Sequence, residues 1–147
     1  MKSIKHVFHI LSYLQYPLVA VALYFYTLFA LSLAKNTFEW ENLNNSLVFY
    51  GLSISLSTLQ DTTKTQNKFS KKIWEHPKKG KIALILMGLM ALLCMIAGTF
   101  GLLKSQASIH KEISFGLVVL GIGLVGLVKT AQEMFENHRK DRKIMKN

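Results

Sequence analysis

Five polar side chains follow one another along an otherwise apolar segment between residues 45 and 61. Four of them alternate in steps of three and four residues, which places them on one face of a helix, and an aspartate ends the line. They are Tyr50, Ser53, Ser57, Gln60 and Asp61. Inside a membrane such groups face another helix or water, because lipid offers no hydrogen-bond partner. The line predicts either a polar path for a solute or a contact between helices.

A second polar group precedes Pro17 in the first apolar segment. His9, Tyr13 and Tyr16 lie at helical spacing and share one face. Pro17 removes one helical hydrogen bond, so we expect a kink near it. If residues 6–34 begin at the same membrane surface where residues 45–61 end, the two polar faces share one depth. We therefore expect them to pair with each other or to border one aqueous path.

The other candidate motifs support no reaction. Residues 121–126 match the GxGxxG pattern of dinucleotide-binding turns, but they lie in the middle of an apolar run, where glycines serve helix packing. His6 and His9 have no matching carboxylate or histidine pair, and the single cysteine, Cys94, cannot form a disulfide within the chain. We predict no catalytic residue, no cofactor and no metal ligand.

These candidates lie on segments that the sequence predicts to be membrane-spanning helices. The chain has 147 residues, of which 50% are hydrophobic and only 18% charged. The runs 82–87 and 117–120 are apolar on all sides, unlike the helices of a soluble bundle. A helix needs about 20 mostly apolar residues to cross the hydrocarbon core of a bilayer. We predict a single all-α transmembrane domain, a polytopic four-helix bundle with spans at 6–34, 45–61, 82–104 and 113–130.

Basic residues indicate the orientation of these spans. They concentrate in the loop 62–81, in the helical tail 131–147 and at the N-terminus, whereas the other two loops carry only Lys35, Lys104 and Lys111. Positively charged loops remain on the cytoplasmic side of a membrane. The expected topology is N-in/C-in, in a bacterial inner membrane or its equivalent. Cleavage of the first segment as a signal peptide stays open, because small residues precede Lys35.

Small residues lie along one side of each of the last two spans. They let helix backbones approach closely, which is how helices associate inside lipid. Because only a short link joins these two spans, we expect them to form a tight antiparallel hairpin. The expected packing residues are Gly88, Ala91, Gly98 and Gly101 in the third span and Gly116, Gly123 and Gly126 in the fourth.

The basic loop reads as a short helix that lies on the membrane surface. Its aromatic residues can enter the interface while its lysines remain in water. The expected contacts with anionic lipid are Lys68, Lys71, Lys72, Trp74, Lys78 and Lys79. Nucleic acid is not an expected partner, because membrane orientation already explains the charge bias and no nucleic-acid-binding motif accompanies it.

Three functions are compatible with this pattern. The first is an oligomeric channel or transporter in which the polar line of the second span borders the path. The second is a non-catalytic accessory or assembly subunit that binds a partner membrane subunit. The third is a membrane enzyme acting on a lipid or a quinone. The direction of the polar line decides between the first two: a water-filled cavity favours transport, and a buried helix contact favours the accessory subunit.

Overall fold

The chain is helical throughout the part that the structure describes. The computed structural model describes residues 2–62, 68–104 and 108–141. Within these ranges it contains no strand and six helices: α1 (Lys2–Ser12), α2 (Gln15–Ala34), α3 (Trp40–Ser57), α4 (Lys68–Trp74), α5 (Pro77–Lys104) and α6 (Ser108–His138). The predicted all-α class is therefore confirmed.

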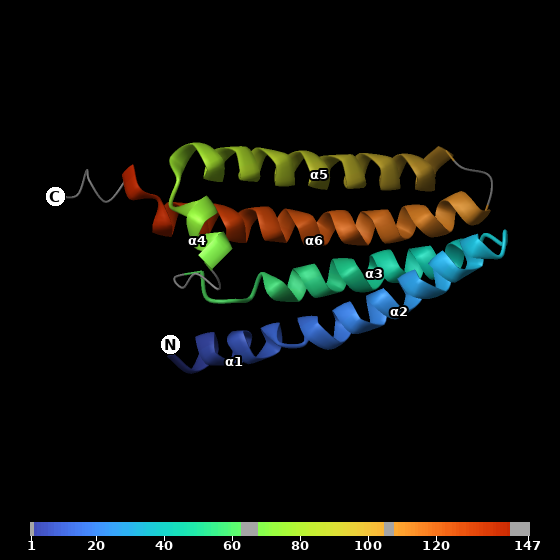
Figure 1. Cartoon of the computed structure of the whole chain (residues 1–147), viewed down its shortest axis with the longest axis horizontal. Coiled ribbons are helices and arrows are strands. Elements are labelled where there is room, and N and C mark those ends of the chain that lie inside the picture. The colour runs from blue at the N-terminus through green and yellow to red at the C-terminus, as the bar shows by residue number, and fades with distance from the viewer. Residues whose placement is uncertain (1, 63–67, 105–107, 142–147) are drawn as a thin grey trace.

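The long helices lie side by side in one row rather than in a closed bundle. α2 packs against α3, α3 against α6, and α6 against α5, whereas no extensive contact between described residues joins α2 to α5 (Figure 1). The expected bundle is in this respect wrong. The short α5–α6 link makes those helices neighbours, and α3 then occupies the other side of α6, where glycines allow a close approach.

Two helices in the middle of the row run in the same direction. Gly116 of α6 meets Asn44 of α3, and Thr130 meets Thr58, so both pairs are separated by 72 residues in sequence. A constant separation means that α3 and α6 are parallel. α2 is antiparallel to α3, and α5 to α6, so the N-terminus, α4 and the end of α6 lie at one end of the row (Figure 1).

The first apolar segment consists of two helices separated by a break. Tyr13 and Leu14 donate their backbone N–H groups to the carbonyls of Ile10 and Leu11, at 3.0 and 3.1 Å, in tightened turns. The break lies one turn before Pro17, because a proline ring displaces the carbonyl four residues earlier and offers that carbonyl no N–H. The predicted kink is present at that position.

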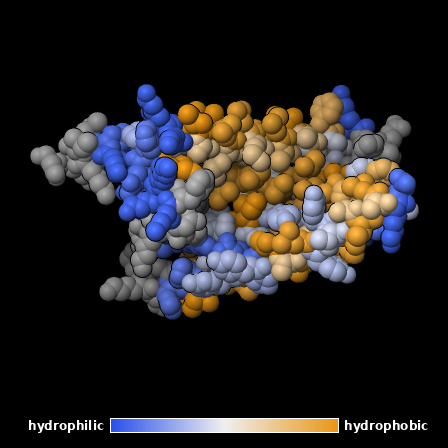
Figure 2. Space-filling view, viewed as in Figure 1, coloured by the Kyte–Doolittle hydropathy of each residue, from blue (hydrophilic) through white to orange (hydrophobic). Residues whose placement is uncertain are grey.

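Among the described residues, three segments are long and apolar enough to span a membrane: His6–Ala34, Pro77–Lys104 and Ile113–His138. Their length and composition are compatible with a small membrane protein. Figure 2 shows hydrophobic surface along the middle of the molecule and hydrophilic surface at the end that carries α4. α3 is not among the three segments, because its 18 residues carry several polar side chains.

The helices differ in their bounds from the expected spans. α3 begins at Trp40 and ends at Ser57, about one turn earlier than expected, and residues 58–60 continue in tighter turns with bonds from residue i to i−3. α5 begins at Pro77, since proline is well tolerated in the first turn of a helix. α6 continues to His138 and includes part of the expected tail.

Candidate functional site

The side of α3 that faces α2 uses serine hydroxyls as interhelix donors. Ser46 Oγ donates to the carbonyl of Ala22 at 3.0 Å, and Ser53 Oγ donates to the carbonyl of Gln15 at 3.0 Å. The two serines are only 1% and 3% exposed. Between them, Phe49 stacks on Phe25 with ring centroids 5.7 Å apart. This side of α3 is a buried, hydrogen-bonded contact.

These bonds do not require α2 to unwind. A backbone carbonyl has two lone pairs, so it can accept a serine hydroxyl in addition to its helical N–H donor. Hydrogen bonds between membrane helices contribute about 0.6 kcal/mol each. Ser46 and Ser53 therefore fix the register of α2 on α3 while contributing little to overall stability.

The opposite side of α3 meets α6 through glycines. A Cβ atom on Gly51 would lie 2.7 Å from the carbonyl oxygen of Val119. A Cβ atom on Gly123 would collide with the carbonyl oxygen of Gly51. The two backbones are therefore in direct contact, and no larger residue fits at either position without moving a helix.

Polar side chains flank this glycine contact at both ends. Asn44 Oδ1 accepts the backbone N–H of Gly116 at 2.8 Å. Toward the other end, Thr130 Oγ1 lies 3.4 Å from the carbonyl of Thr58, to which it donates. The sequence interpretation missed Asn44. The signal was available, since Asn44 lies two helical turns before Gly51 and one face of α3 carries both.

The predicted polar line of α3 does not act as one unit. Ser53 contacts α2, whereas Ser57 Oγ donates to the carbonyl of Ile54 in its own helix at 2.6 Å. Tyr50 is half-buried, and Gln60 lies in the tightened turn after α3. Asp61 is exposed beyond that turn. The polar and small residues of α3 instead form two contacts, one with α2 and one with α6.

The expected partner face on the first segment lies elsewhere. Tyr13 and Tyr16 are 54% and 62% exposed, and His9 is exposed with them. The Tyr13 ring contacts the other two: it lies edge-on to His9, with ring centroids 5.3 Å apart, and stacks on Tyr16, with ring centroids 6.2 Å apart. The expected pairing of this face with α3 is therefore absent, and Ser12 and Gln15 lie toward α3 instead.

The small residues of α5 and α6 serve two different contacts. Ala91 is buried, and a Cβ atom on Gly98 would lie 2.7 Å from a Val118 methyl group, so both mark the α5–α6 contact. Among the described residues, no atom of a neighbouring helix lies within 4 Å of such a Cβ on Gly88, and Gly101 is half-buried. α6 has a neighbour on each side, α3 and α5. The glycines of α6 that were expected to contact α5 face α3 instead: Gly116, Gly123 and Gly126.

A small apolar cluster packs α4 against α6 at one end of the row. Trp74 of α4 packs against Ala131 and Phe135 of α6 and is only 9% exposed. A Cβ on Gly80 would collide with the ring of Phe135, so α5 starts in close contact with α6. Trp74 was expected to enter lipid, and its burial corrects that expectation. α4 is joined to the protein by its aromatic side chain.

Ion pairs reinforce this cluster. Glu75 accepts Lys140 at 3.1 Å and lies 3.8 Å from Lys71, so it links α4 to the end of α6. The guanidinium of Arg139 lies 3.4 Å from Glu136. These charges are partly exposed, so each pair contributes at most about 1 kcal/mol.

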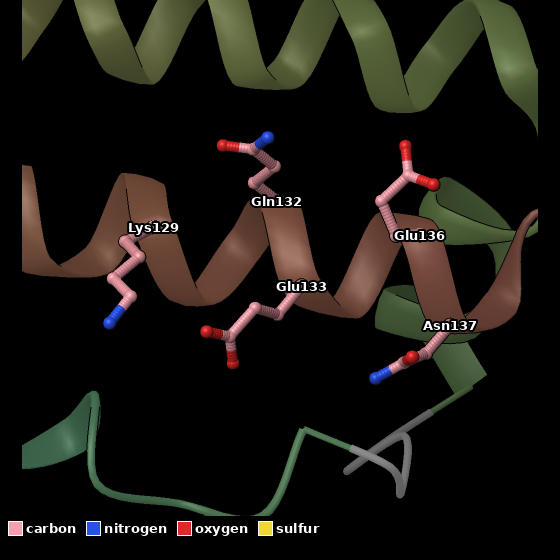
Figure 3. A pocket seen from close by; sticks show the side chains of 5 residues that line it. All are labelled: Lys129, Gln132, Glu133, Glu136 and Asn137. Atoms are coloured by element: carbon pink, nitrogen blue, oxygen red, sulfur yellow. The ribbon is translucent and has the colours of Figure 1, made fainter.

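An open hollow lies beside the same end of α6. Its volume is about 510 Å³, and its lining residues all belong to one helix (Figure 3): Lys129, Gln132, Glu133, Glu136 and Asn137. Glu133 and Lys129 point toward the segment after α3, where Thr62 Oγ1 lies 3.5 Å from Glu133. Within the described ranges, no group of three metal-ligating side chains comes together. The hollow is a mixed-charge surface groove.

Comparison with protein-family models, with curated proteins and with solved structures finds no significant match.

Proposed function

We propose that this chain is a four-span integral membrane protein with both termini in the cytoplasm. α3 lies between α2 and α6, two helices of membrane-spanning length and composition, and runs antiparallel to one and parallel to the other. The N-terminus, α4 and the end of α6 share one end of the row, and this end carries the described basic residues Lys71, Lys72 and Lys140. The positive-inside rule then orients that end toward the cytoplasm.

Within this topology, we propose a non-catalytic accessory or assembly subunit. The proposal rests on the hydrogen bonds that polar side chains of α3 form with the two neighbouring helices. Ser46 and Ser53 donate to carbonyls of α2, and Asn44 accepts from the backbone of α6. Because Ser46 and Ser53 are buried on α2, their hydroxyls hold helices together rather than face a solute.

The open row supports the same proposal. A single layer of helices encloses no lumen, so a solute path would need further copies of the chain. The outer side of α5 is apolar and exposed over its length, including Leu89, Leu93 and Ile96. Such a surface is free to contact a partner helix or lipid.

An oligomeric channel is the second candidate. It is favoured by the half-buried Tyr50 and by the exposed tyrosines Tyr13 and Tyr16, whose hydroxyls are not buried against a neighbouring helix. In an oligomer these groups could border a path between copies. The two candidates differ in whether the polar side of α3 meets water.

Cysteine labelling distinguishes the two candidates. Single cysteines replace Ser53 or Thr37 in a Cys94→Ala background, and a charged, membrane-impermeant thiol reagent is added to the protein in bilayers. The accessory proposal predicts protection at position 53, which is buried on α2, and rapid labelling at the exposed position 37.

The molecular mass provides the second measurement. Rapid labelling at position 53 in a closed oligomer would overturn the accessory proposal in favour of a channel. Protection at position 53, with a native mass that shows no ring of copies, would support it. Protection at both positions would show that the reagent does not reach the loop between α2 and α3, which contradicts the proposed topology.

A further inference from the structure

The corner formed by α4 and the start of α5 carries a fixed array of lysines. α4 cannot rotate freely, because Trp74 is buried against Ala131 and Phe135 of α6. Ile73 packs partly against the same cluster. Helical spacing places Lys68, Lys71 and Lys72 on the side of α4 opposite these apolar residues, and all three are exposed. The fold therefore presents the lysines of α4 outward.

The first turn of α5 extends this array. Lys78 and Lys79 directly follow Pro77 and are exposed. The apolar part of α5 begins at Ile82, only three residues further on. Because a helix rises 1.5 Å per residue, these ammonium groups lie within about one turn of the hydrocarbon boundary. That is the depth of lipid phosphate groups.

Nearby carboxylates leave most of this charge unneutralised. Glu75 is held by Lys140 at 3.1 Å and by Lys71 at 3.8 Å. Among the described residues, no carboxylate forms an ion pair with the other four lysines, which are Lys68, Lys72, Lys78 and Lys79. Four lysines of this corner therefore keep a positive charge that no ion pair with a described carboxylate neutralises.

We propose that Lys68, Lys72, Lys78 and Lys79 form a binding site for the headgroup of an anionic phospholipid. The ligand is a lipid phosphate in the same leaflet, held by ammonium groups that snorkel from the first turn of α5 and by the outer face of α4. Single-stranded nucleic acid fits less well, because its recognition needs exposed aromatic platforms. Trp74, the aromatic residue of this corner whose side chain is described, is buried.

The proposal rests on the proposed membrane orientation, but it can fail independently. If the lysines do not bind lipid, the labelling pattern at positions 37 and 53 is unaffected. If α4 faced the opposite side of the membrane, position 37 would be labelled from the cytoplasmic side instead of the outside, while the lysines could still bind headgroups. The two experiments therefore give separable results.

The test measures the thermal unfolding of the purified full chain in detergent with added phosphatidylglycerol or phosphatidylcholine. A variant carrying Lys72→Gln, Lys78→Gln and Lys79→Gln is compared with one carrying Lys35→Gln, Lys104→Gln and Lys111→Gln at the other end of the row. Each basic residue near an anionic surface contributes roughly a fivefold change in affinity, so the first variant is expected to bind phosphatidylglycerol on the order of 100-fold more weakly.

We expect phosphatidylglycerol to raise the Tm of the parent chain and of the control variant more than phosphatidylcholine does. We expect the first variant to lose this difference while keeping the lipid-free Tm. Equal loss in both variants would show a diffuse charge effect and overturn the site. So would an undiminished response of the first variant, or tighter binding of a single-stranded RNA oligonucleotide than of phosphatidylglycerol at the same salt concentration.

Discussion

α3 and α5 belong to the same row of helices but differ in the polarity of their side chains. α5 spans Pro77–Lys104 and is almost uniformly apolar, yet few of its side chains are buried and only α6 covers its length. α3 is shorter and more polar, yet it is covered on both sides, by α2 and by α6. The helix with the weaker hydropathy therefore makes the more specific contacts.

This difference follows from what surrounds each helix. A helix at the edge of the row meets lipid along most of its surface, so apolar side chains suit it and polar ones would lose hydrogen bonds. A helix in the middle meets two backbones, so small residues and hydroxyls suit it. α6 also lies in the middle of the row, but glycines make its close contacts with α3, so its composition remains that of a membrane span. α3 contacts its neighbours through serine and asparagine side chains as well, and these lower its hydropathy below that of the segments of membrane-spanning composition.

The largest expected effect is at the glycine contact of α3 with α6. Gly123→Leu should lower stability in detergent by about 1–3 kcal/mol, because the side chain collides with the Gly51 carbonyl and must separate two backbones. Reversible unfolding in a denaturing detergent measures the change. Gly88→Leu is the matched control, since no described atom of a neighbouring helix lies within 4 Å of a Cβ there. Equal losses at the two positions would refute the distinction between the central and the edge helix.

A smaller effect is expected on the α2 side of α3. Ser53→Ala removes the hydroxyl that donates to the Gln15 carbonyl and should cost about 0.6 kcal/mol. Ser57→Ala removes a hydroxyl that bonds only within its own helix, so its effect should be close to zero. The same unfolding experiment compares the two. A larger loss for Ser57→Ala than for Ser53→Ala would mean that α3 is rotated relative to the contacts described.

The smallest effect is expected on the outer side of α5. Leu93→Ala removes an apolar side chain that is 66% exposed. Lipid or detergent replaces the lost contacts, so the unfolding free energy should change by less than about 0.5 kcal/mol. A substantial destabilisation of the isolated chain would show that the outer side of α5 is covered, either by a second copy or by another part of the protein.

The sequence predicted the class of the fold and several local features from direct physical causes. The length of the apolar runs predicted α2, α5 and α6 as long helices, and Pro17 predicted the break before α2. The sequence could not predict which helix is whose neighbour. Gly116 and Gly123 were expected to contact α5, because a short link makes α5 adjacent to α6. α6 also has a second neighbour, α3, which the spacing of the glycines along the sequence does not identify.

The exposure of Trp74, Tyr13 and Tyr16 could not be predicted from the sequence either. An aromatic residue beside lysines fits the membrane interface and a protein core equally well by composition. Trp74 is buried because Ala131 and Phe135, some sixty residues later in the chain, return to the same end of the row. Tyr13 and Tyr16 are exposed because the turn before Pro17 directs Ser12 and Gln15 toward α3. Both outcomes depend on contacts that are distant in sequence.

In the proposed topology, α3 crosses the membrane even though its composition is not that of a typical span. Single cysteines at Thr37, between α2 and α3, and at Thr62, after α3, test it directly in the Cys94→Ala background. A membrane-impermeant thiol reagent is added to intact cells or to inside-out vesicles. We expect labelling of position 37 from the outside only and of position 62 from the cytoplasmic side only. Labelling of both positions from the same side would show that α3 does not cross the membrane and would overturn the four-span topology.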